Sequence, residues 1–193
     1  DLQQLIKNIE QWAEDRNLIK GSSIKKQTLK MVEEFGELCG GVAKGNINII
    51  KDSIGDCFVV LTIINAQCRN ESVETNANQS HLLEPTGHFR ASSIDEALLR
   101  TAARIGGFAS KTTPPDDWDV NCLSNYLFLI SKMANLDFWD CVQYAYEQIK
   151  DRKGRMINGV FVKEGIYNGT IFFNQRDRAD GHLFGSNSET LDF

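Results

Sequence analysis

The sequence predicts an all-α protein, an antiparallel helical bundle of about five to six helices with a small C-terminal β-hairpin appendage. Apolar residues recur at helical spacing along most of the chain, and the breaks between these stretches are rich in Asn, Gly, Ser or Pro. Alternation typical of strands begins only after Gly154. With 193 residues, 41% of them hydrophobic and 24% charged, the chain can form one substantial core.

Helical periodicity marks several segments in turn. The predicted helices cover residues 2–16, 24–44, 47–68, 94–110, 118–133 and 138–153. Ser22 and Ser23 are N-cap candidates for the second helix, and Gly45-Asn46 ends it. Because the break before the third helix is so short, we expect these two helices to pack antiparallel as a hairpin. The third is apolar on most sides, which predicts a central, buried helix.

The remaining segments are polar or strand-like. Residues 69–93 lack periodicity and contain Asn, Ser, Thr, Gly and Pro, so we interpret them as a loop inserted into a domain of residues 1–164. Val160 and Val162, then Ile171 and Phe173, alternate around Asn168-Gly169 as in a short hairpin. Residues 165–193 are therefore predicted to form the hairpin and a loose tail.

The composition indicates the cellular compartment and restricts the classes of binding partner. The formal net charge of −5 argues against a stable nucleic-acid complex. The five cysteines are odd in number and include no CxxC pair, so they are expected to be reduced core residues. No uninterrupted apolar run of about 18 residues is present, so the sequence predicts a cytoplasmic protein without a membrane span.

Two acidic segments carry the strongest functional signal. The second predicted helix contains Glu33-Glu34-Phe35-Gly36-Glu37, and the third contains Asp52-Ser53-Ile54-Gly55-Asp56. Residues three or four apart share a helix face, so each segment can present two carboxylates to one point, and an antiparallel hairpin can bring the two sets together. The first segment alone is more typical of a solvated helix face. Acids inside an apolar helix, however, need a metal, a basic partner or solvent.

Such a cluster of carboxylates favours a bound cation. Like charges about 4 Å apart repel by about 4 kcal/mol per pair at an effective dielectric constant near 20. Mg²⁺ prefers oxygen ligands, retains waters and bridges protein carboxylates to phosphates, and Mn²⁺ is expected to substitute for it. The pattern therefore predicts a Mg²⁺ site.

These residues resemble the MazG-like all-α nucleoside triphosphate pyrophosphohydrolases, whose pattern is EExxE followed by ExxD. Glu33, Glu34 and Glu37 match the first part, and Asp56 matches the final aspartate. Ser53 stands where the family has glutamate. The resemblance is best over residues 24–64 and returns over residues 145–164.

Asp52 resembles the KDxxGD variant of some MazG-like proteins, in which an i, i+4 aspartate pair replaces the i, i+3 pair. The resemblance therefore implies Glu34, Glu37, Asp52 and Asp56 as Mg²⁺ ligands. It also implies hydrolysis of a (deoxy)nucleoside triphosphate to the monophosphate and pyrophosphate by a metal-activated water. Glu33 or Glu34 is the candidate general base.

The leaving pyrophosphate requires cations, and the best candidates follow the last predicted helix. Lys153 and Arg155, with Arg152 and Lys44 behind them, are the predicted substrate-binding residues. The basic run could equally complement the dipole of a helix C-terminus. The resemblance further implies a homodimer or homotetramer in which a second subunit completes the base pocket, whereas no residue pattern identifies the preferred base or sugar.

Two other functions remain to be weighed. A catalytically impaired helical interaction module that retains the fold would explain Ser53, and it predicts no Mg²⁺-dependent turnover. The acidic pairs and the basic closing segment count against it. A di-iron carboxylate bundle would require Glu-x-x-His on two helices, and none of the three histidines is placed that way. We therefore reject the di-iron alternative.

Overall fold

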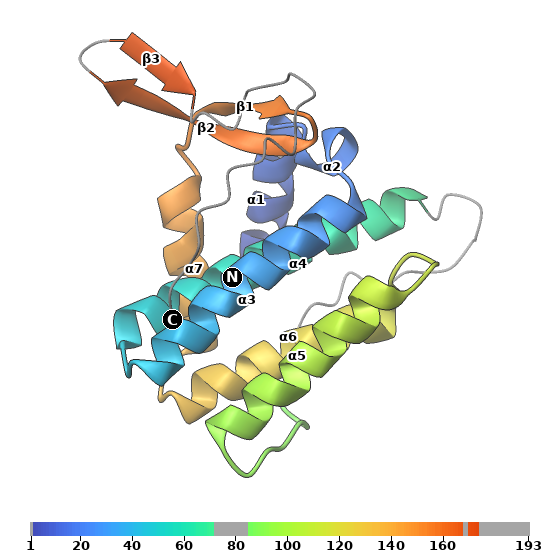
Figure 1. The fold of residues 1–193 in the computed structure, drawn as a ribbon, viewed down its shortest axis with the longest axis vertical. Coiled ribbons are helices and arrows are strands. Elements are labelled where there is room, and N and C mark those ends of the chain that lie inside the picture. Colours follow the sequence, from blue (N-terminus) through green and yellow to red (C-terminus); the bar gives the residue numbers. More distant parts are fainter. Residues whose placement is uncertain (1, 72–84, 168–169, 174–193) are drawn as a thin grey trace, which may run out of the picture.

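A computed structural model describes residues 2–71, 85–167 and 170–173 (Figure 1). Within these ranges the chain forms seven helices and three strands. They are α1 (Leu2–Asp15), α2 (Leu18–Gly21), α3 (Ile24–Ala43), α4 (Ile47–Glu71), α5 (Ile94–Ser110), α6 (Asp117–Met133), α7 (Phe138–Ile149), β1 (Gly154–Ile157), β2 (Val160–Tyr167) and β3 (Thr170–Phe173). The predicted fold class, a helical bundle with a small C-terminal β-structure, is confirmed.

Helix α4 lies at the centre of the bundle and contacts α1, α2, α3, α6 and α7. Figure 1 shows α3 and α4 side by side across the middle, with the α5–α6 pair on one side and the strands near α1 and α2. Ile54, Phe58, Leu61 and Ile64 of α4 are completely buried. The central, buried helix predicted from the apolar pattern is therefore present.

The short link between α3 and α4 determines how the two helices pair. Gly45 adopts a φ of +61°, a left-handed conformation that glycine tolerates, and the chain reverses there. One turn earlier, within α3, a Cβ on Gly41 would lie 2.8 Å from the Ile49 side chain of α4, so the two helix backbones approach closely. This antiparallel contact fixes which residues of α3 face which residues of α4.

The sequence predicts that this last helix ends at residue 153, but α7 ends at Ile149. The indole Nε1 of Trp12 donates a hydrogen bond to the Ile149 carbonyl at 2.8 Å. Arg16 donates to the Arg152 carbonyl from Nε at 3.0 Å and from Nη2 at 2.7 Å. Trp12 in α1 and Arg16 just after it bind carbonyls that an additional helical turn would have used, and the chain leaves the helix at this point.

The segment predicted as an inserted loop, residues 69–93, divides into three parts. Residues 69–71 continue α4, residues 72–84 lie outside the described residues, and residues 85–93 pack near α6. Asn125 Oδ1 accepts hydrogen bonds from the backbone N–H groups of Thr86, at 2.9 Å, and Gly87, at 3.3 Å.

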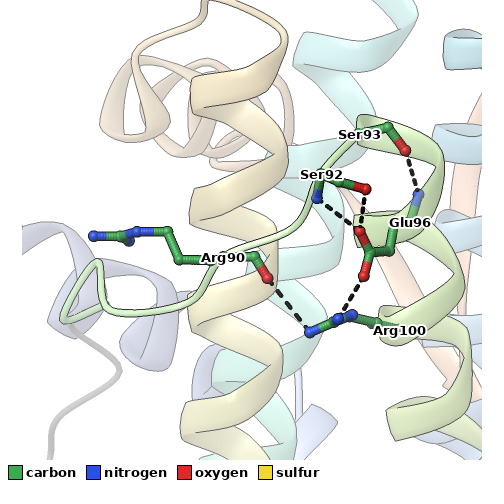
Figure 2. A network of polar contacts seen from close by, with 5 residues as sticks. All are labelled: Arg90, Ser92, Ser93, Glu96 and Arg100. Carbon is green, nitrogen blue, oxygen red and sulfur yellow. Dashed lines mark hydrogen bonds and ion pairs between the residues drawn. The ribbon is translucent and has the colours of Figure 1, made fainter.

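A polar network ties the end of this segment to the first turn of α5 (Figure 2). The Ser93 hydroxyl caps α5 by accepting a hydrogen bond from the Glu96 N–H. The Glu96 carboxylate accepts from the N–H and hydroxyl of Ser92 and from Arg100. These hydrogen bonds lower the pKa of Glu96 to about 2, so the carboxylate stays ionised and holds the segment in place.

The β-structure is more extensive than the sequence predicted. The first half of β2 pairs antiparallel with β1, and the second half pairs antiparallel with β3. The β1–β2 turn is Asn158-Gly159, whose φ values of +50° and +77° suit a two-residue hairpin turn. The β2–β3 pair corresponds to the predicted hairpin, although its turn, residues 168–169, and the tail, residues 174–193, lie outside the described residues.

Two observations bear on the predicted compartment. No described helix combines the length and the hydropathy needed to cross a bilayer. The five cysteines are free thiols, four of them buried and Cys39 half-buried. The thiols thus occupy core or near-core positions, as the odd cysteine count predicted.

The tightest contact of α4 gives a stability prediction. A Cβ on Gly55 would lie 2.3 Å from the Cys141 carbonyl oxygen and 2.6 Å from the Ala145 Cβ, both in α7. Gly55→Ala should therefore force α4 and α7 apart and lower the free energy of unfolding by about 1–3 kcal/mol. Urea denaturation followed by circular dichroism measures this change.

Gly36→Ala is the matched control, because Gly36 lies inside α3 and an added Cβ would meet no atom within 4 Å. It should raise the free energy of unfolding by about 0.5–1 kcal/mol through helix propensity alone. Equal effects of the two substitutions would show that the α4–α7 contact is not close-packed.

Candidate functional site

The α3–α4 pairing brings Glu34 close to Asp56. Gly41 and Ile49 meet near the loop, and two helical turns farther from it the same two faces carry Glu34 and Asp56. Glu34 is 7% exposed and Asp56 is half-buried. The two sets of carboxylates predicted to meet across the helical hairpin therefore do approach each other.

The charge environment of Asp56 is strongly unfavourable to its ionised form. Burial, then the negative charges of Glu34 and Asp52, raise the pKa of Asp56 from 3.8 to about 7, while Arg152 and Lys30 act in the opposite direction. The Asp56 carboxylate has no hydrogen-bond or ion-pair partner in the described part of the chain. A half-buried acid in this state is ready to accept a positively charged ligand.

Three cationic side chains come from different elements to surround these carboxylates. Lys30, one turn before Glu34 on α3, forms ion pairs with Glu34 at 2.6 Å and with Glu33 at 3.1 Å. Arg152 follows α7 and is positioned by the hydrogen bonds that Arg16 donates to its carbonyl. Lys163 is on β2 and lies within electrostatic reach of Glu34, Asp56, Lys30 and Arg152.

The residues predicted from the sequence divide into two groups. Besides Glu34 and Asp56, Asp52 and Arg152 belong to the cluster, since both act on the pKa of Asp56. Glu33 is exposed and turns toward Lys30, and Glu37 is exposed, although its charge reaches Cys57, the residue after Asp56.

The other predicted substrate-binding residues lie farther out. Lys44 is at the C-cap of α3, ten residues from Glu34, which places it about 15 Å along the helix axis. Lys153 and Arg155 are exposed at the start of the β1–β2 hairpin. Of the predicted cations, Arg152 is therefore the one that acts on Asp56.

Sequence reasoning missed Lys30, Lys163 and the positioning role of Arg16. The spacing of Lys30 to Glu33 and Glu34, i, i+3 and i, i+4, was a usable signal. Lys163 gives no such local signal, because its position depends on the packing of its hairpin against α1 and α3, which are distant in sequence. The Arg16 hydrogen bonds likewise span more than 130 residues of sequence.

The donor chemistry of the cluster fits Mg²⁺. Among residues 2–71, 85–167 and 170–173, no three acidic, cysteine or histidine side chains are gathered tightly enough to form a complete metal site as they stand. Mg²⁺ is nevertheless commonly bound through one or two carboxylates together with substrate phosphates. Glu34, Asp52 and Asp56 offer oxygen donors alone, and the unpartnered Asp56 carboxylate is available to such an ion.

Asp56→Asn is expected to stabilise the metal-free protein at about pH 8 and to have little effect at about pH 4. Because the pKa of Asp56 is about 7 in the folded state and near 3.8 when unfolded, the folded state holds the proton more tightly. The stability that comes from this proton is complete below about pH 4 and is lost as the pH rises through 7. The gain at high pH should be a few kcal/mol, at most about 4.

Urea titrations in EDTA across this pH range measure the effect. Asp95→Asn, an exposed carboxylate-to-amide change in the first turn of α5, is the matched control and should not show this pH dependence. If wild type and Asp56→Asn lose stability in parallel between about pH 4 and 7, Asp56 is not the strained acid described above.

Comparison with known proteins gives one informative relative. No protein-family profile and no solved structure matches the chain. The chain is 44% identical over 163 residues to the "Uncharacterized 18.2 kDa protein in rep-hol intergenic region" of Haemophilus phage HP1 (strain HP1c1). The match covers 75% of this chain and 98% of the phage protein. Identity at this level over nearly the whole of the phage protein means that the chain belongs to the same family as this phage protein.

Proposed function

We propose that the protein is a Mg²⁺-dependent hydrolase that converts a (deoxy)nucleoside triphosphate into the monophosphate and pyrophosphate. The observation that carries this proposal is the arrangement of opposite charges around Asp56. The negative charges are those of Glu34 and Asp52, and the positive charges of the same cluster are those of Lys30, Arg152 and Lys163. A metal-bound polyphosphate needs both, because carboxylates hold the metal and cations bind the phosphates.

Glu34, Asp52 and Asp56 are the residues that would hold Mg²⁺, with Glu37 at the edge of the same interface. When bound, Mg²⁺ would neutralise charge on the triphosphate and lower the pKa of a coordinated water. The repulsion that Glu34 and Asp52 exert on Asp56 is then an advantage, because each negative charge that destabilises the metal-free protein stabilises the bound cation.

Between the two candidate bases, the geometry supports Glu34. Both glutamates pair with Lys30, but the Glu34 side chain is 9% exposed and its charge acts on Asp56, whereas the Glu33 side chain is 58% exposed. A base must lie within hydrogen-bond reach of the water whose proton it takes, and Glu34 is the one beside the cluster. Arg152 would stabilise the charge that develops on the leaving pyrophosphate, with Lys153 and Arg155 contributing from the hairpin.

The proposal also concerns the state in which the protein works. Leu29 and Val32 on α3 are 67% and 49% exposed, and Leu99 on α5 is 72% exposed. Large exposed apolar side chains on helices that contact each other support a homodimer or homotetramer, in which a second subunit completes the base pocket. The free cysteines support a reducing compartment, and we propose the cytoplasm.

The first test is pyrophosphate release from a panel of ribo- and deoxynucleoside triphosphates, with and without Mg²⁺, followed by identification of both products. Wild type is expected to yield monophosphate and pyrophosphate only when Mg²⁺ is present. Asp56→Asn should lower turnover by about 100-fold or more, and Glu34→Gln by about 100- to 10,000-fold, while both remain folded. Asp95→Asn should behave as wild type.

Two outcomes would contradict the proposal. Normal turnover by folded Asp56→Asn would show that the acidic cluster is not the active site. A wild-type protein that neither hydrolyses any nucleotide nor binds Mg²⁺ would favour a helical interaction module that has the fold without catalysis.

A further inference from the structure

The hairpin that carries Lys163 contacts α3 at its turn and α1 through Phe161. At its turn, Lys26 Nζ donates a hydrogen bond to the Asn158 carbonyl, and a Cβ on Gly159 would lie 2.8 Å from the Lys26 side chain. Nearer its base, Phe161 packs edge-on against Trp12, with ring centroids 6.2 Å apart. The β1–β2 hairpin thus lies across α1 and the start of α3 as a fixed element.

Strand geometry directs Lys163 toward these helices. Residues two apart in a strand share a face, so Lys163 lies on the same face of β2 as Phe161, the face that packs on Trp12. The cross-strand partner of Lys163 is Gly154, which offers no side chain to pair with it. Lys163 therefore has no side chain directly opposite it on β1, and its charge interacts with Glu34 and Asp56.

Opposite charges meet here without neutralising each other. Lys163 has no hydrogen-bond or ion-pair partner in the described part of the chain, and neither has Asp56, although the negative charge of Asp56 acts on Lys163. Arg152 and Lys30 oppose the positive charge of Lys163, just as Glu34 and Asp52 oppose the negative charge of Asp56. Two unpaired charges of opposite sign, each among like charges, suit a ligand that carries both signs, such as a metal–polyphosphate.

We propose that Lys163 is a phosphate-binding residue of this site, contacting the pyrophosphate portion of the substrate together with Arg152. The β1–β2 hairpin is then a wall of the active site and not an appendage to the bundle. The identity of the substrate as a nucleoside triphosphate rests on the proposed function, whereas the binding of a polyphosphate by Lys163 does not require turnover.

The test is calorimetric titration of the full chain with inorganic pyrophosphate in the presence of Mg²⁺. Lys163→Met keeps the length of the side chain and removes its charge, and it should weaken binding about 10-fold or more. Lys163→Arg should restore most of the affinity. Lys132→Met, an exposed lysine at the end of α6, is the matched control and should bind as wild type.

Two results would overturn the inference. One is wild-type affinity in folded Lys163→Met, and the other is a wild-type protein that does not bind Mg²⁺–pyrophosphate. Circular dichroism shows whether each variant is folded, and recovery by Lys163→Arg separates loss of charge from loss of structure.

Nucleotide turnover by wild type, measured in parallel, separates this inference from the proposed function. Pyrophosphate binding that depends on Lys163, without hydrolysis of any nucleotide, would retain the inference and reject the enzyme. Hydrolysis with an unchanged KM in Lys163→Met would do the reverse. If both hold, the substitution should raise KM more than it lowers kcat, because phosphate contacts present in the bound substrate are lost.

Discussion

The burial of α4 is the constraint on which the rest of the structure depends. Five helices contact it, so its side chains must be apolar along most of its length. It nevertheless carries Asp52 and Asp56 in its first half. Burial and the neighbouring acids destabilise the ionised form of Asp56 and raise its pKa to about 7. No side chain in the described residues forms an ion pair with Asp56. Helix α4 therefore carries the destabilised acid Asp56 at its interface with α3, where Glu34 adds a further carboxylate. Such unfavourable charges in an otherwise well-packed core are typical of binding sites.

Two of the positive charges, those of Arg152 and Lys163, come from the segment after α7 and from the β1–β2 hairpin. Both segments contact Trp12 or Arg16 near the end of α1. Trp12 and Arg16 bind the carbonyls at the end of α7, and this ends the helix just before Arg152. Trp12 also packs against Phe161, so the same side chain positions the hairpin that carries Lys163. The α3–α4 pair carries the acids together with Lys30, which forms an ion pair with Glu34, whereas Arg152 and Lys163 come from the segment after α7 and from the hairpin. Packing at Trp12 therefore positions two of the three cations relative to the acids.

The sequence predicts the parts of this arrangement that local periodicity and spacing determine. The helices, the α3–α4 hairpin and the convergence of Glu34 with Asp56 all follow from apolar patterns and short breaks. The end of α7 and the position of Lys163 do not, because both depend on contacts between distant segments. The β1–β2 turn is different, since Asn158-Gly159 is a strong local hairpin signal. The alternation of apolar residues predicts a hairpin only around Gly165 and Asn168-Gly169, so this first turn is not among the predictions.

The serine at position 53 is central to whether the cluster is catalytic or a remnant. Ser53 is 1% exposed, so a glutamate there would have to bury its carboxylate in the core of the bundle. Asp52, one residue earlier and about 100° around the helix, is half-buried and acts on Asp56. The acid at position 52 therefore keeps a second carboxylate near Asp56, while the small Ser53 side chain packs in the core. Compared with the MazG-like pattern that the sequence resembles, the acid lies one position earlier, which supports the proposed metal site over the alternative of an interaction module.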